Sequence, residues 1–174
     1  PHSPPSTPTH SNCPATLKGD FEYPHLIVPV DSAHPEKPYG TSYFGQVSSS
    51  ISSIFNFDIP VSYTGKSCSL IFFLPPKGSL ETSDYNLTGP GAIGISALNY
   101  PANDTTTYNN KPSALTDLGE GTFQQNKTYT FATFSCPAGS TIGFELSGKG
   151  DTSFTWFQDY NPQPIGLYIT VCKK

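Results

Sequence analysis

Proline and glycine are so frequent in this chain that long helices are excluded. The sequence contains 18 Pro and 15 Gly among 174 residues. Proline removes a backbone donor and clashes with the preceding helical turn, and glycine weakens helices because its backbone loses more freedom on folding. Between these residues lie short stretches rich in aromatic and branched aliphatic residues, which favour strands. The pattern predicts an all-β protein and excludes a helical bundle.

Hydrophobic residues follow strand-like patterns in most of these stretches. The clearest are segments 55–59, 93–97, 129–135, 142–146, 154–158 and 165–171. The continuous apolar run 68–74, which two prolines end, predicts a central strand. Pro24 and Pro29 instead place segment 21–30 at the edge of a sheet. About eight short strands separated by turns predict an antiparallel β-sandwich.

Two parts of the chain lack a strand pattern. Residues 1–14 are rich in Pro, Ser and Thr, and we expect an extended N-terminal arm there, followed by one sandwich domain over residues 15–174. Residues 100–125 are polar and weakly patterned, which predicts a long loop with room for one short turn of helix.

Four widely spaced cysteines without a C-x-x-C pair argue against zinc and for two disulfides. Cys13 and Cys172 lie at the two ends of the expected domain, and because domain termini are often close, we predict that they pair. Cys68 and Cys136 would then join neighbouring strands of the core. Four cysteines allow three connectivities, so the other two pairings stay open.

The sequence also has the marks of a secreted glycoprotein. N-glycosylation sequons begin at Asn86, Asn103 and Asn126. The composition of residues 1–9 is typical of O-glycosylated stalks, and methionine is absent, as expected if a signal peptide has been removed. Together with the paired cysteines, these features predict a secreted, extracellular protein, with the cell wall as one possible location.

Charge and hydropathy exclude two classes of partner. Nine Lys, no Arg and 13 acidic residues give a net charge of −4. Nucleic-acid binding depends on clustered Lys and Arg, and the chain has no such cluster. No apolar run approaches the ~20 residues of a membrane helix. We therefore expect neither nucleic acid nor a membrane as partner.

Each catalytic or metal-binding motif has a plainer structural interpretation. Residues 89–94 match G-x-G-x-x-G, but a proline interrupts them and a strand pattern follows, so they indicate a turn. Ser96 lies in half of a nucleophile elbow that lacks its second glycine. The spacing of His25, Asp31 and His34 matches no standard metal motif. We expect no cofactor, no metal and no catalytic residue.

Aromatic residues remain as candidates for ligand binding, because sugar rings stack on exposed aromatic faces. We single out the segment of Trp156, Phe157, Asp159 and Tyr160, which ends in a polar turn. Trp156 alternates with a phenylalanine, so we expect it to be buried and its neighbours Phe157 and Tyr160 to be partly covered. Further aromatics beside Gly, Asn or Pro are Tyr39, Tyr43, Tyr85, Tyr100 and Tyr108.

Several segments resemble the fungal But-type C-terminal domain, a family named for binding a ubiquitin-like-activating enzyme. They are residues 21–31 (FEYPHLIVPVD), 39–43 (YGTSY), 54–60 (IFNFDIP), 65–70 (GKSCSL) and 168–172 (YITVC). The resemblance covers nearly everything after residue 20 and implies a fungal protein that is secreted or wall-associated. It supplies no reaction, and the cytosolic partner in the family's name conflicts with the sequons and paired cysteines.

Three functions follow from these observations, and we favour the first. The chain could be a secreted glycoprotein domain without catalytic activity, with a structural or binding role at the cell wall or cell surface. It could be a carbohydrate-binding module for β-glucan, chitin or plant polysaccharide. It could also be a small metalloprotein or a glycan-active enzyme, whose candidate acids are Asp20, Glu22, Asp58, Asp151 and Asp159.

Overall fold

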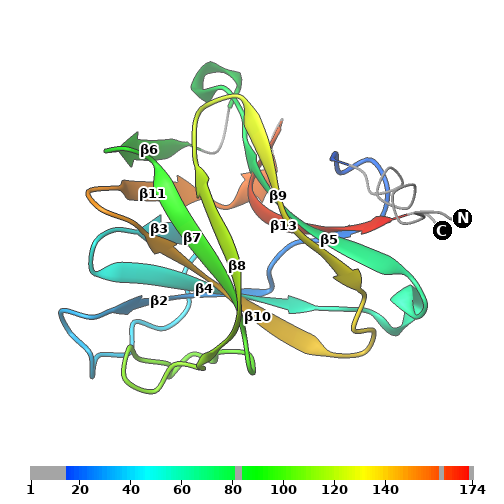
Figure 1. The fold of residues 1–174 in the computed structure, drawn as a ribbon, viewed down its shortest axis with the longest axis horizontal. Coiled ribbons are helices and arrows are strands. Elements are labelled where there is room, and N and C mark those ends of the chain that lie inside the picture. The colour runs from blue at the N-terminus through cyan, green and yellow to red at the C-terminus, as the bar shows by residue number, and fades with distance from the viewer. Residues whose placement is uncertain (1–14, 81–83, 161–162, 173–174) are drawn as a thin grey trace, which may run out of the picture.

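A computed structural model of the chain describes residues 15–80, 84–160 and 163–172, most of which lie in antiparallel strands (Figure 1). Sheet A has the order β1-β13-β5-β9, with β12 also paired to β13, sheet B the order β2-β4-β10-β7-β8, and sheet C the order β3-β11-β6. The bounds are β1 Phe21–Glu22, β2 Leu26–Asp31, β3 Phe44–Val47, β4 Ile51–Asp58, β5 Ser67–Leu74, β6 Tyr85–Thr88, β7 Ala92–Leu98, β8 Ala114–Thr122, β9 Lys127–Ser135, β10 Thr141–Gly148, β11 Ser153–Phe157, β12 Asp159–Tyr160 and β13 Pro164–Cys172.

The predicted antiparallel β-sandwich is confirmed. Sheets A and B enclose one hydrophobic core, to which β4 contributes Phe55 and Phe57, β5 Leu70 and Phe72, and β10 Phe144 and Leu146. Sheet C closes one end of this core, at the left of Figure 1. The structure has more strands than the expected number of about eight, because it also contains short strands such as β3, β6 and β12. Residues 1–14, the expected arm, lie outside the described residues.

The positions of three strands agree with their sequence patterns. The apolar run of residues 68–74 lies in β5, which is central in sheet A between β13 and β9. Segment 21–30 contributes β1 and β2, which lie at the edges of sheets A and B. A proline costs least at such an edge, because the missing N–H is not needed by a neighbouring strand.

Strand β4 is covered on both faces, although its alternation predicts a half-buried strand. On its outer face, Ile54 packs with Val28 and Ala102, and Asn56 exchanges two hydrogen bonds with the backbone of Ala102 at 2.7 and 3.1 Å. The loop between β7 and β8 therefore lies over sheet B. Asn56 is polar, and its alternation with phenylalanines predicts an exposed side chain. It is buried because the loop supplies partners for both ends of its amide.

The same loop is attached to sheet B by a shielded ion pair. Glu145 of β10 is buried and accepts a hydrogen bond from the Ser52 hydroxyl at 2.5 Å. The ammonium of Lys111 lies 3.0 Å from the Glu145 carboxylate and neutralises it. Because a buried charge needs such a partner, Lys111 fixes the end of the loop to the sheet.

Strand β8 contradicts the expectation of a long loop with a short helical turn over residues 100–125. Its nine residues pair with β7 and form the edge of sheet B, mostly exposed to solvent. The sequence ALTDLGEGT contains two acids and two glycines and has weak strand propensity. Pairing with β7 supplies the hydrogen bonds that its own sequence does not predict.

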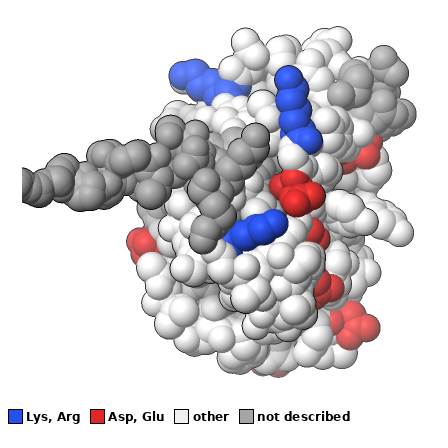
Figure 2. Space-filling view, turned by 90° about the vertical axis from the view of Figure 1, so that its right-hand side faces the viewer, with Lys and Arg blue, Asp and Glu red and all other residues white. Residues whose placement is uncertain are grey.

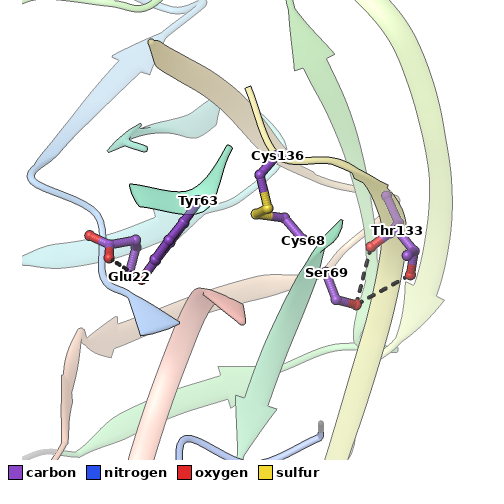
Figure 3. Close-up of a disulfide and its surroundings, with 7 residues drawn as sticks. Glu22, Tyr63, Cys68, Ser69, Thr133 and Cys136 are labelled. Atoms are coloured by element: carbon purple, nitrogen blue, oxygen red, sulfur yellow. Dashed lines mark hydrogen bonds between the residues drawn. A yellow bond between two sulfur atoms is a disulfide. The ribbon is translucent and has the colours of Figure 1, made fainter. Parts of the chain in front are cut away.

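A disulfide joins β5 to the end of β9, as predicted. Cys68 and Cys136 are bonded, with their Cα atoms 5.0 Å apart (Figure 3). Next to it, the Ser69 hydroxyl contacts the Ala132 carbonyl and the Thr133 hydroxyl. Cys172 is also disulfide-bonded. Its predicted pairing with Cys13 stays a prediction, because Cys13 lies outside the described residues.

Trp156 of β11 contacts all three sheets and is fully buried, as expected. Its ring stacks on Phe55 of β4, with centroids 5.8 Å apart and planes at 12°. It meets Phe72 of β5 edge-on at 5.1 Å. The indole also lies over Gly45 of β3, where any Cβ would overlap three ring carbons. Only glycine therefore fits at position 45.

We expect Gly45→Ala to lower the free energy of unfolding by roughly 1–3 kcal/mol, the range for overpacking a well-filled core. The added methyl group must displace the Trp156 ring from its contacts with both main sheets. Urea unfolding followed by tryptophan fluorescence measures the change. Gly19→Ala is the matched control, because a Cβ there has no heavy atom within 4 Å. Equal stability of the two variants would contradict this packing.

Candidate functional site

A groove of about 760 Å³ runs along the place where the chain crosses from sheet A to sheet B. Residues 23–25 make this crossing, between the end of β1 and the start of β2. One wall comes from Phe21 and residues 23–27 and the other from residues 41–43 and 158–160, with Tyr168 of β13 also in the lining. The volume is within the ~300–1,000 Å³ that is usual for ligand sites. We call it the tyrosine groove.

Backbone hydrogen bonds fix the two walls relative to each other. The Ser42 N–H donates to the Ile27 carbonyl at 2.9 Å, and the Gln158 N–H donates to the Tyr43 carbonyl at 3.1 Å. The segment before β3 is therefore attached to β2 on one side and to residue 158 on the other. Because the backbone holds both walls in place, binding would cost little reorganisation.

Three tyrosines of the groove expose much of their surface. The exposed fractions are 67% for Tyr23, 80% for Tyr43 and 47% for Tyr160. Beneath them, Phe21 contacts the rings of Tyr160 and Tyr168, with centroids 6.1 and 6.0 Å apart. The groove thus presents aromatic surface to solvent above a packed aromatic layer.

The hydroxyls of these tyrosines differ in their partners. The buried Tyr168 donates to the Asp159 carbonyl at 2.7 Å, and burial raises the pKa of its hydroxyl. Within the described part of the chain, the hydroxyls of Tyr23, Tyr43 and Tyr160 have no hydrogen-bond partner. These three are available to donate to a ligand.

Gln158 connects the groove to the core. Its Oε1 accepts hydrogen bonds from the Trp156 indole N–H at 3.0 Å and from the Leu167 N–H at 3.1 Å, and its Nε2 donates to the Leu167 carbonyl at 2.9 Å. A Cβ at Gly166 would overlap the Gln158 amide, and the φ of +113° there also favours glycine. The amide of Gln158 is therefore fully engaged and positions β12 beside β13.

The charges around the groove are few. No lysine is among its lining residues, and Asp159 supplies one carboxylate. The ring of His25 lies 3.1 Å from Asp58, which also accepts a hydrogen bond from Thr141 at 2.5 Å. Figure 2 shows one face of the molecule, where Lys and acidic side chains are scattered and form no large basic area.

Several of the acids and histidines singled out in the sequence have structural partners. Asp31 is 3.2 Å from His34 and also accepts the N–H of Ala33, a hydrogen bond that lowers the pKa of the Asp31 carboxyl. Glu22 accepts a hydrogen bond from Tyr63 at 2.7 Å (Figure 3). Among the residues that the structure describes, no three His, Cys, Asp or Glu side chains gather as metal ligands would.

The two catalytic-type motifs lie in a turn and a strand. Residues 89–91 join β6 to β7, and residues 92–94 belong to β7, so a strand and not a helix follows the turn and no helix N-terminus is present there for a phosphate to bind. Ser96 lies within β7, paired with Glu145 and Asp117 in the sheet. None of the described helices has the length and hydrophobicity of a membrane span.

The structure divides the four candidate binding residues of the C-terminal segment. Asp159 and Tyr160 line the groove. Trp156 does not, because it is fully buried in the core. Phe157 is half-buried against Phe44, with centroids 5.3 Å apart, and lies outside the groove lining. The expectation that Trp156 and Phe157 bind a ligand is therefore corrected: both side chains pack within the fold and neither lines the groove.

Sequence reasoning missed Tyr23 and His25 as groove residues, and named Tyr43 only within a larger set of aromatics. Tyr23 had one usable signal: it precedes a proline between two edge strands, where its ring has no sheet face to cover. Of the other aromatics, Tyr85 is buried, and Tyr39, Tyr100 and Tyr108 are exposed away from the groove.

The three sequon asparagines are exposed, as N-glycosylation requires. Asn86 lies in β6, Asn103 in the loop over sheet B, and Asn126 in the turn before β9 with a φ of +64°. None of the three lines the tyrosine groove. Glycans at these positions would leave the groove open.

Comparison with known proteins gives a family match. A family model described as the ubiquitin 3 binding protein But2 C-terminal domain matches residues 22–162. Two proteins of Schizosaccharomyces pombe, each described as an uncharacterized but2-like protein, are 28% and 27% identical to this chain over 146 and 151 residues. Both alignments cover 80% of this chain but 31% and 37% of the relatives, so the chain spans about a third of their length.

We expect Gln158→Ala to lower the free energy of unfolding by about 2–4 kcal/mol, because it leaves the Trp156 N–H and two backbone groups of Leu167 without partners. Urea unfolding measures the loss. Gln124→Ala is the control, since that side chain is exposed and outside this network. An effect of Gln158→Ala no larger than that of the control would contradict the role assigned to the amide.

Proposed function

The chain belongs to the But2 C-terminal domain family, and from that premise we propose that it acts without catalysis, as a binding domain of a secreted protein at the cell wall or cell surface. The tyrosine groove is its ligand-binding surface. The observation that carries this proposal is the exposure of Tyr23, Tyr43 and Tyr160 along one preformed groove. Exposed aromatic residues that converge on a concavity are typical of binding sites.

A disulfide and three exposed sequons support an extracellular location. The Cys68–Cys136 bond needs an oxidising environment to persist, and the three sequons have exposed asparagines. Ubiquitin, which the family description names, is a partner from a reducing compartment. We therefore favour an extracellular ligand for this chain over ubiquitin.

A binding role also agrees better with the groove than an enzymatic one. Asp159 is the sole carboxylate among the lining residues. Glycoside hydrolysis commonly uses two carboxyl groups about 5–10 Å apart on either side of the scissile bond. The other candidate acids lie elsewhere, and Glu22 and Asp58 are engaged by Tyr63 and by His25.

We expect the full chain to sediment with isolated fungal cell walls, and the double variant Tyr23→Ala/Tyr43→Ala to bind at least about tenfold more weakly. Two lost aromatic contacts at ~1 kcal/mol each are sufficient for that change. Both side chains are exposed, so the variant should unfold at the wild-type temperature. The measurement is the bound fraction as a function of wall concentration.

Tyr100→Ala is the matched control, because Tyr100 is 55% exposed but lies in the loop over sheet B, outside the groove. Wall binding that is equal in all three proteins would overturn the assignment of the groove. A carbohydrate-binding module is the second candidate function, favoured by the same tyrosines. Competition by soluble β-glucan or chitin oligomers would identify it.

We expect Asn126 to carry an N-glycan when the chain passes through a eukaryotic secretory pathway, because its side chain is exposed in a turn that a glycan can extend from. Intact mass before and after glycosidase treatment measures occupancy, and Asn126→Gln should remove one glycan. A secreted protein whose mass does not change with the enzyme would count against the compartment argued above.

A further inference from the structure

We infer that the tyrosine groove binds proline-rich segments in the polyproline II conformation, and that residues 1–10 of the same chain are its occupant. This inference rests on the proposed binding role of the groove. Residues 1–10 read PHSPPSTPTH and contain the spacing Pro-x-x-Pro twice, at Pro1 and Pro4 and at Pro5 and Pro8. Polyproline II has three residues per turn, so each such pair lies on one face of the segment.

The groove has the chemistry that such a segment needs. Proline-rich segments dock in aromatic-lined grooves because pyrrolidine rings pack on aromatic faces and the ligand is already extended. Tyr23, Tyr43 and Tyr160 supply the faces. Polyproline II forms no internal hydrogen bonds, so its carbonyls need donors, and the three tyrosine hydroxyls can provide them.

The polar groups of the groove favour a peptide of this kind over a sugar chain. Both ends of the Gln158 amide are used within the fold, and the His25 ring faces Asp58. The Ser42 hydroxyl accepts the Phe44 N–H at 3.0 Å. Each sugar ring carries several hydroxyls that require partners, whereas a proline-rich segment requires few. Because the Gln158 amide and the His25 ring nitrogen already have partners, the groove suits a proline-rich segment better than a sugar chain.

Charge points to the same occupant. The groove lining contains the Asp159 carboxylate and no lysine. Residues 1–10 contain no acidic side chain and include His2 and His10. The segment is therefore neutral or cationic and brings no acidic side chain to a chain whose net charge is −4.

The chain enters the described region close to the groove. Leu17 is buried in a cluster with Ile71, Phe73 and Tyr168, and Phe21 packs against that cluster. Phe21 and Tyr168 both line the groove. Fourteen residues precede Ala15, and at 3.1 Å per residue they span roughly 40 Å. Residues 1–10 can thus reach the groove of their own chain.

The predicted pairing of Cys13 with Cys172 leaves the groove within reach. Cys172 lies four residues beyond Tyr168 along β13, about 13 Å at the rise of a strand. Twelve residues would then remain before the bridge, with a span of about 37 Å. A tether of this length gives an effective concentration in the millimolar range, which favours the chain's own segment over one from a second copy.

The consequence is regulation of the binding site by its own chain. External ligands must displace residues 1–10 before they bind. Replacing the prolines of this segment should therefore make the groove available to external ligands, whereas replacing Tyr43 should weaken the binding of any ligand.

The test uses a fluorescent peptide with the sequence of residues 1–10 and the full chain in four forms: wild type, Pro4→Ala/Pro5→Ala/Pro8→Ala, and that variant with either Tyr43→Ala or Tyr100→Ala added. We expect the proline variant to bind the peptide about tenfold more tightly than wild type, for an effective concentration of ~1 mM and a peptide Kd of ~0.1 mM. Adding Tyr43→Ala should weaken binding about fivefold, the change expected for one lost aromatic contact of ~1 kcal/mol, and adding Tyr100→Ala should not weaken it. A peptide with alanine at its prolines should bind none of the proteins.

Each other outcome overturns a defined part of the inference. Equal peptide affinity of wild type and proline variant excludes residues 1–10 as the occupant. Oligomers of the wild type that form with concentration, and that the proline variant lacks, would assign the occupant to a second copy. Wall binding that depends on Tyr23 and Tyr43, without peptide binding, overturns the inference and leaves the proposed function standing; competition by β-glucan oligomers would then identify a glycan site. If neither wall nor peptide binding depends on the tyrosines, both fail.

Discussion

The contacts of a single indole ring hold the three sheets in one arrangement. Trp156 belongs to sheet C, stacks on Phe55 of sheet B and meets Phe72 of sheet A edge-on. The absence of a side chain at Gly45 makes room for the ring, and the Gln158 amide accepts its N–H. Because the same amide binds Leu167 on β13, the position of the ring also determines where β12 and one wall of the groove lie. The proposed binding surface thus depends on a core residue that no ligand can touch.

The sequence was sufficient to predict elements in which one strand face is clearly hydrophobic. Strands β7 and β10 alternate because one face meets the core, and β5 is mostly apolar because both its faces are covered. Strand β13 alternates in its sequence although both its faces are buried. Strand β8 escaped prediction, since an exposed edge strand gains its stability from pairing with β7 and needs no apolar residues of its own. The burial of Asn56 escaped prediction for the opposite reason: this polar side chain is buried because a loop distant in sequence supplies its hydrogen-bond partners.

The groove could be predicted only in part, because its residues come from four distant segments of the chain. Tyr160 and Asp159 lie beside a recognisable strand end, so their position was informative. Tyr23 and Tyr43 join them only after β1 pairs with β13 and the Ser42 N–H bonds to Ile27. Neighbouring sequence cannot distinguish the ring of Tyr43, which lines the groove, from that of Tyr100, which does not. The burial of Trp156 was predictable, because its alternation with Phe154 places both rings on the face that meets the core.

The position of β8 at the edge of sheet B affects how closely spaced copies of the protein could associate. A long unpaired edge is a template on which a second copy could add its own strand, and proteins displayed densely on a surface face that hazard constantly. Here Asp117 and Glu120 lie on the edge strand, and the pairing with β7 shifts register twice along its length. Two such edges brought together would juxtapose carboxylates and mismatched backbones. The acidic residues that weaken the strand pattern of β8 in the sequence thus also oppose fibrillar stacking of neighbouring molecules.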